Sequence, residues 1–180
     1  MTLPEPVGLG YFPKRTHARP EWLKASAVQE ICSVSQCISP GPDDWIQKWL
    51  HNELGFYDTT ELAWKVIGRD EAGFEMFAYQ AYPLQFDEGA VQPWLVPVRV
   101  ELDLSGFVFL GLDLVSRSSE THFECSALSC NHGADHFPVN RFCLMDDPIA
   151  AYDACMTVSK GGYEPGPYHL LEVYRRAPGG

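Results

Sequence analysis

The chain has 180 residues, of which 46% are hydrophobic and 13% aromatic, and this composition indicates an ordered globular protein with a buried core. A formal net charge of −11 argues against general nucleic-acid binding, which needs clustered lysine and arginine to neutralise phosphates. No apolar run reaches the ~18 residues that cross a bilayer, and the first residues lack the pattern of a secretory signal. We therefore expect a cytoplasmic protein that binds neither nucleic acid nor membrane.

The chain offers no linker that would divide it, so residues 1–180 are expected to form a single domain. Residues 1–19 are rich in proline and glycine and lack periodicity, which predicts an extended N-terminal arm lying over the core. Residues 20–28 open with a proline and predict a short helix. Residues 29–39 alternate in character and favour a strand.

Two consecutive helices are predicted next. In residues 39–55, Pro42 precedes an acidic pair and then four apolar residues at helical spacing, which indicates an amphipathic helix held by its tryptophan face. In residues 58–68, Asp58 and Glu61 have the spacing of a capping box, and a glycine ends the run.

The rest of the chain predicts strands and one further helix. Three β-rich runs cover residues 73–86, 94–104 and 107–116, and in the second of these apolar and charged residues alternate. The run 145–162 places aspartates and Pro148 before apolar residues and ends in two glycines, which predicts a helix, and residues 168–176 predict a last strand. The sum is an α+β fold with a largely antiparallel or mixed sheet of about five to six strands and about three helices.

The segment HFECSALSCNHGADH, residues 122–136, concentrates residues that bind metals. Zinc takes about four nitrogen or sulfur ligands, and a CxxC or HxxxH pair is the usual mark of such a site in a sequence. Cys125 and Cys130 lie five residues apart, which sets them on opposite faces of a strand or about 140° apart around a helix, so convergence requires a turn. The candidate ligands are Cys125, Cys130, His132, His136 and Cys143, with His122 also in this region.

An earlier run echoes this segment. Cys32 to Cys37 and Cys125 to Cys130 share the form CSxxxC, and four thiols would face one another if the two runs packed together. One short match does not establish a repeat, which requires similarity at a sustained period. We therefore treat the echo as coincidence.

A thiol enzyme is a further interpretation of the same segment. It requires a thiolate activated by a histidine that a third group orients. Cys125 or Cys130 with His132, and Asn131 or Asp135 as the third group, supply these residue types.

Three runs, FECSALSCN, VNRFCL and EPGPYHLLEVYR, resemble uncharacterised bacterial proteins that carry similar runs near their carboxyl ends. The resemblance covers the last third of the chain and, more loosely, its middle. It implies a bacterial cytosolic family and brings no activity, ligand or catalytic residue with it.

The leading functional hypothesis is a non-enzymatic acidic protein that acts by binding a protein partner, as an accessory or toxin-neutralising factor. Its basis is the acidic charge, the aromatic content and the absence of an assembled catalytic motif. The alternative is a zinc-binding protein or metal-assisted hydrolase that uses the cysteines and histidines of residues 122–143, and the further alternative is the thiol enzyme. No cofactor is expected other than zinc under the second hypothesis.

Overall fold

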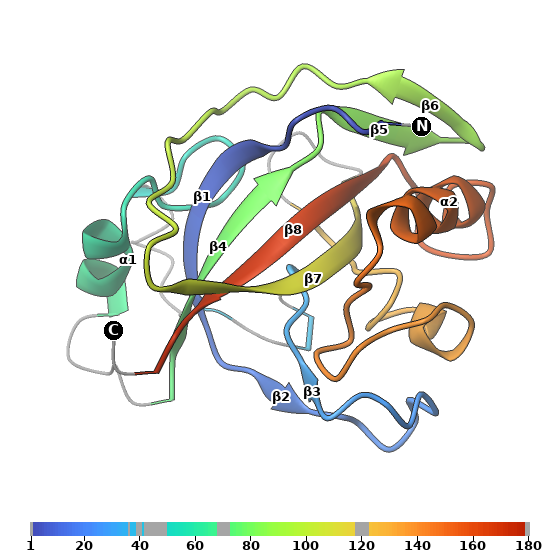
Figure 1. Ribbon diagram of the computed structural model, residues 1–180, viewed down its shortest axis with the longest axis horizontal. Coiled ribbons are helices and arrows are strands. Elements are labelled where there is room, and N and C mark those ends of the chain that lie inside the picture. The colour runs from blue at the N-terminus through green and yellow to red at the C-terminus, as the bar shows by residue number, and fades with distance from the viewer. Residues whose placement is uncertain are drawn as a thin grey trace.

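The computed structural model describes residues 2–35, 37–38, 41, 50–67, 73–117 and 123–178. Within these residues the chain has an α+β fold, as predicted, with a six-stranded antiparallel sheet, a two-stranded sheet and two α-helices (Figure 1). The helix predicted over residues 39–55 lies mostly outside the described residues. Neither α-helix of the described part has the length and apolar character that crossing a membrane requires.

The large sheet is built around its last strand, β8, which pairs with β4 and then β5 along one edge and with β7 along the other. Its strands are β1 (Val7–Lys14), β4 (Glu75–Ala81), β5 (Leu84–Asp87), β6 (Ala90–Pro93), β7 (Phe107–Ser116) and β8 (Tyr168–Arg176). The small sheet pairs β2 (His17–Ala18) with β3 (Glu30–Ile31), and the helices are α1 (Thr60–Ile67) and α2 (Pro148–Val158). The predicted strands over 107–116 and 168–176 are thereby confirmed, and the single β-rich run predicted over 73–86 forms two strands, β4 and β5.

The predicted strand over residues 94–104 forms no strand. Its buried and exposed side chains do alternate, because one side packs on the core. The segment meets β1 through the amide of Val100, which donates to the carbonyl of Gly8 at 2.9 Å, and through the amide of Asp103, which donates to the hydroxyl of Tyr11 at 2.7 Å. The alternation of side chains here arises because the segment packs beside β1, although the two do not form the regular backbone hydrogen bonds of paired strands.

The N-terminal third also departs from its predictions. Residues 7–14 are extended, but they form a strand of the large sheet, β1, with buried side chains. The helix predicted over residues 20–28 is wrong, because this segment folds as two separate turns, closed by the amides of Leu23 and Val28. Within the described residues of the strand predicted over 29–39, only Glu30–Ile31 forms one, and residues 36 and 39 lie outside them.

The helix over residues 58–68 is confirmed, but its cap is not the predicted one. The hydroxyl of Thr59 accepts from the amide of Leu62 at 3.1 Å, whereas the carboxylate of Asp58 accepts from the side chain of Asn52. At α2 the side chain of Asp147 accepts from two backbone amides of the first turn, as expected.

The two halves of the chain repeat one order of elements. A strand, a CSxxxC run, a helix and a second strand occur first as β1, α1 and β4 and again as β7, α2 and β8. Tyr79 of β4 pairs with Val173 of β8 at the centre of the sheet. On its other side Tyr79 pairs with Gly10 of β1, and Val173 pairs with Gly111 of β7. The register of each outer strand shifts at its glycine. An approximate two-fold axis between β4 and β8 therefore relates the halves, with α1 and α2 on opposite sides (Figure 1). The echo of the cysteine runs marks matching places in this repeat.

The two faces of the large sheet carry different chemistry. Cross-strand partners point to the same face. The pairing of Asp113 with Leu171 therefore places both on one face, and the pairing of Leu112 with Glu172 places both on the other. The helix α2 packs on the second face, against Leu112. The candidate metal site lies beside β7, on the face of the sheet that carries Asp113.

Candidate metal site

Three cysteine sulfurs converge at the surface. The Sγ atoms of Cys37, Cys125 and Cys130 all lie within 4.8 Å of one another, and those of Cys37 and Cys125 are 3.6 Å apart. Cys37 is exposed and the other two are half-buried. With Zn–S bonds of about 2.3 Å, tetrahedral geometry sets ligand sulfurs about 3.8 Å apart, so the three thiols need only small shifts to hold one ion.

The edge of β7 positions Cys125. The amide of Ser116 donates to the Cys125 carbonyl at 2.9 Å, and the Cys125 amide donates back to the Ser116 hydroxyl at 3.2 Å. A turn follows at once, in which the amide of Cys130 donates to the carbonyl of Ser126 at 3.0 Å. This turn brings together two sulfurs that a strand or a helix would separate, so the five-residue offset does not prevent convergence.

Cys37 lies in the first half of the chain, in the loop that follows β3. Its amide donates to the hydroxyl of Ser35 at 3.2 Å, and that hydroxyl lies 3.5 Å from the sulfur of Cys130. The cluster therefore joins a loop of the first half to a turn of the second half. Cys37 belongs to the echoed run of the sequence but was not among the predicted ligands.

A buried lysine holds the loop that leads to Cys37. The Nζ atom of Lys14 donates to the carbonyls of Ser33, Val34 and Ser35 at 2.5, 2.9 and 2.6 Å. These three acceptors match the three N–H groups of an ammonium ion. Lys14 is 1% exposed, so nearly all of its solvation comes from these carbonyls.

A buried aspartate connects the same loop to the cysteine turn. One carboxylate oxygen of Asp113 accepts from the amide of Val34 at 2.7 Å. The other accepts from the hydroxyl of Ser126 at 2.6 Å and from the amide of Leu114 at 2.9 Å. Because Ser126 begins the turn that ends at Cys130, Asp113 fixes the two sulfur-bearing segments relative to each other.

The charges around the cluster are coupled. Burial lowers the pKa of Lys14 to about 7, and the negative charge of Asp113, followed by those of nearby cysteines including Cys130 and Cys37, opposes the shift. Burial likewise raises the pKa of Asp113, against its hydrogen bonds and the charge of Lys14. The ammonium of Lys14 therefore favours both the Asp113 carboxylate and thiolates at the cluster.

The thiols of Cys125 and Cys130 are not activated as nucleophiles. Burial raises the pKa of Cys125 to about 12, with the hydrogen bond and the charge of Cys37 adding to it, and burial also raises the pKa of Cys130. A reactive cysteine needs the opposite shift, whereas a bound metal ion deprotonates its thiol ligands outright. The arrangement suits metal ligation better than covalent catalysis.

The other predicted ligands lie elsewhere. His132 and His136 line a hollow of about 650 Å³ with Lys24, and Nδ1 of His132 lies 3.6 Å from a carboxylate oxygen of Asp135. Cys143 is fully buried at a left-handed backbone position, φ 62°. Of the five predicted ligands, the structure brings Cys125 and Cys130 together and places these three apart from them. His122 lies outside the described residues.

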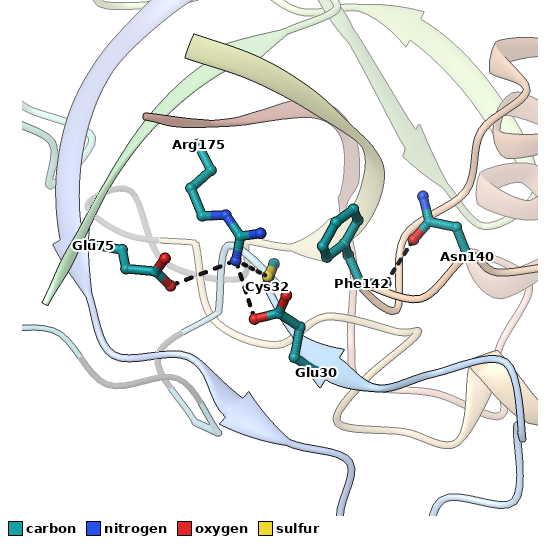
Figure 2. A network of polar contacts seen from close by, with 6 residues as sticks. All are labelled: Glu30, Cys32, Glu75, Asn140, Phe142 and Arg175. Carbon is teal, nitrogen blue, oxygen red and sulfur yellow. Dashed lines mark hydrogen bonds and ion pairs between the residues drawn. The ribbon is translucent and has the colours of Figure 1, made fainter. Parts of the chain in front are cut away.

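The fourth thiol of the two echoed runs, Cys32, belongs to a separate network. Figure 2 shows the guanidinium of Arg175 between Glu30 and Glu75, with its Nη1 atom 3.1 and 3.5 Å from their carboxylates. The same nitrogen lies 3.9 Å from the sulfur of Cys32, and the ring of Phe142 packs against the guanidinium. Burial raises the pKa of Cys32 to about 12. This network holds the start of the loop that carries Cys37.

Comparison with known protein families, with curated proteins and with solved structures finds no match to this chain.

Proposed function

We propose that the chain binds one thiophilic metal ion, with Zn²⁺ as the expected ion, through the thiolates of Cys37, Cys125 and Cys130. The observation that carries this proposal is the convergence of the three sulfurs within 4.8 Å. Thiolates select zinc and other soft or borderline ions over magnesium and calcium, which prefer oxygen.

The buried residues that hold the two cysteine-bearing segments in place indicate that the three sulfurs converge by structure and not by a chance contact. A lysine and an aspartate, both buried, bind the backbone and side chains of the two segments that carry the sulfurs. Burying such a pair costs solvation energy that the mutual attraction only partly returns. In a metal site these residues act as outer-shell groups that orient the ligands. In its protonated form Lys14 also offsets the net negative charge of three thiolates around a divalent ion.

The three ligands found among the described residues leave one tetrahedral position for water or for a substrate atom. This count is typical of catalytic zinc, whereas structural zinc usually has four protein ligands. Metal-assisted hydrolysis is therefore the activity to test first once the metal is identified. Binding of a protein partner stays a separate prediction from the acidic composition, and recovery of a stoichiometric partner from cell extract at low salt would test it.

Metal content tests the proposal directly. Protein purified under reducing conditions without chelator should contain about one zinc per chain, or take up about one Co²⁺ with the intense visible absorption of tetrahedral thiolate coordination. Cys37→Ala is the sharpest variant, since Cys37 is exposed and its loss leaves the core intact. Cys155→Ala, at a buried cysteine of α2, is the matched control and should bind normally. Wild-type protein that takes up no ion, or C37A protein that binds as wild type does, would overturn the proposal.

A further inference from the structure

A second hollow lies on the face of the sheet opposite the cysteine cluster. It has a volume of about 570 Å³, within the range of small-ligand pockets. The N-terminal segment and the start of α2 form its walls, and two residues of β8, Gln80 of β4 and one residue that follows β4 form its floor. The residues that define its chemistry are Pro4, Glu5, Tyr82, Ile149, Glu172 and Tyr174.

The floor presents a carboxylate oriented by two phenols. One oxygen of Glu172 accepts from the hydroxyl of Tyr82 at 2.9 Å, and the other accepts from the hydroxyl of Tyr174 at 2.7 Å. Burial, followed by the hydrogen bond and charge of Glu172, raises the pKa of both phenols above the ordinary value, so they remain donors. Each carboxylate oxygen keeps a second lone pair for another donor.

No basic side chain in the described part of the chain forms an ion pair with Glu172. A second carboxylate, that of Glu5, lines the same hollow, and its negative charge further raises the pKa of Tyr82. A half-buried carboxylate without a counter-ion attracts cations more strongly than one in bulk water, because the surrounding medium screens less. The aromatic floor and the proline-containing walls suit an aliphatic chain attached to the charge.

We infer that this hollow binds an organic cation, a guanidinium or alkylammonium group on a short aliphatic chain, with Glu172 as its anionic partner. A guanidinium fits both carboxylate oxygens at once. The cation could belong to a free small molecule or to a side chain of a basic protein, and the chemistry of recognition is the same. This inference stands independently of the metal site, which lies on the other face.

Calorimetric titration tests the inference with three probes: agmatine, an acetylated and amidated Gly-Arg-Gly peptide, and the same peptide with citrulline in place of arginine. Wild-type protein should bind agmatine or the arginine peptide and reject the citrulline peptide, which keeps the shape without the charge. Agmatine binding alone would indicate a small-molecule ligand, and equal or tighter peptide binding would indicate a protein side chain. Both results support the cation site.

Glu172→Gln should weaken binding at least about tenfold, since a charged hydrogen bond is lost. Glu101→Gln is the matched control, because it removes the same charge from an exposed position and should change nothing. Unfolding of both variants by urea verifies their folding, and the citrulline comparison on wild-type protein holds even if the E172Q protein unfolds. Absence of binding up to about 10 mM of either cation, equal binding of citrulline, or unchanged binding by a folded E172Q protein would overturn the inference.

Discussion

Asn52 and Asn140 occupy matching places in the two halves of the chain, and their side chains make the same four kinds of hydrogen bond. Each side-chain amide oxygen accepts from the backbone amides of the residues two and four positions later. Each side-chain amide nitrogen donates to a backbone carbonyl of the outer strand of its half, β1 or β7, and to the carboxylate of the aspartate six positions later. For Asn52 the partners are Leu54, Phe56, Leu9 and Asp58, and for Asn140 they are Phe142, Leu144, Leu110 and Asp146. Each helix begins eight residues after its asparagine.

These asparagines should therefore matter equally to stability. Asn52→Ala and Asn140→Ala each remove four hydrogen bonds and leave buried backbone groups without partners, so each should lower the free energy of unfolding by about 2–4 kcal/mol. Urea unfolding of the two variants and of the surface control Gln92→Ala measures this effect. A variant of one asparagine that retains wild-type stability would contradict the equivalence of the two halves.

Lys14 and Asp113 should behave as a coupled pair. Lys14→Met removes three hydrogen bonds to backbone carbonyls and leaves the buried Asp113 carboxylate without the nearby positive charge, which should together cost about 3–5 kcal/mol of stability. Asp113→Asn in the same chain removes the uncompensated charge, so the double variant should be more stable than the sum of the single losses implies.

A double-mutant cycle from urea unfolding gives the coupling between Lys14 and Asp113, expected at about 1–3 kcal/mol. The same variants should bind zinc more weakly than wild type, because the loop before Cys37 loses its anchor. Additive losses of stability would show that the two charges do not interact.

His169 should make stability depend on pH. Its ring is fully buried, its Nδ1 lies 3.2 Å from the carbonyl of Leu84, and burial, together with the positive charge of Arg117, lowers the pKa of His169 from 6.5 to about 3. Between pH 3 and pH 6.5 the unfolded chain therefore binds more protons at this position than the folded chain does. The stabilising contribution is complete above pH 6.5 and is lost progressively as the pH falls through this window.

The free energy of unfolding of the variant His169→Gln should depend less on pH. Between pH 7 and pH 3 it should fall by up to about 5 kcal/mol less than that of the wild type. Urea unfolding of both proteins at several pH values measures the difference in slope, which removes the contributions of groups common to both. Parallel curves for wild type and variant would exclude His169 as the source.

Oxidation should compete with metal binding. The sulfurs of Cys37 and Cys125, 3.6 Å apart, can form a disulfide when hydrogen peroxide takes two electrons and two protons from the thiols and becomes two molecules of water. We expect a loss of two hydrogens in the intact mass and a crosslink between the peptides that carry these cysteines. Bound zinc should slow the reaction, and Cys125→Ala should abolish this particular crosslink. A disulfide that forms equally fast in zinc-loaded protein would contradict a shared site.

Elements with complete local signals were predicted well from the sequence. For α2, an aspartate cap, a proline at the first position and closing glycines define the helix without reference to the rest of the chain. The run 168–176 likewise matches β8, because its apolar and aromatic residues and the EPGP turn before it are local signals. Residues 94–104 show the limit, since their alternation records burial but cannot reveal whether a partner strand accepts their hydrogen bonds.

The candidate site could be predicted only in part, because its geometry depends on contacts between the two halves. Cys125 and Cys130 were candidates by residue type, but Cys37 joins them only through the packing of a loop that lies 88 residues before Cys125. Nothing in the sequence around Lys14 marks it as buried, since its three carbonyl partners are backbone atoms. The echo of the two CSxxxC runs was the signal that could have directed attention to Cys37.

X-ray absorption spectroscopy at the zinc edge tests the central claim most directly, because it counts the atoms bound to the metal. Zinc-loaded protein should show a shell of three sulfurs at about 2.3 Å with one lighter atom completing the coordination, and C37A protein should lose that shell. A first shell of nitrogen and oxygen only, or a sulfur shell that persists in C37A protein, would contradict a metal site built from Cys37, Cys125 and Cys130.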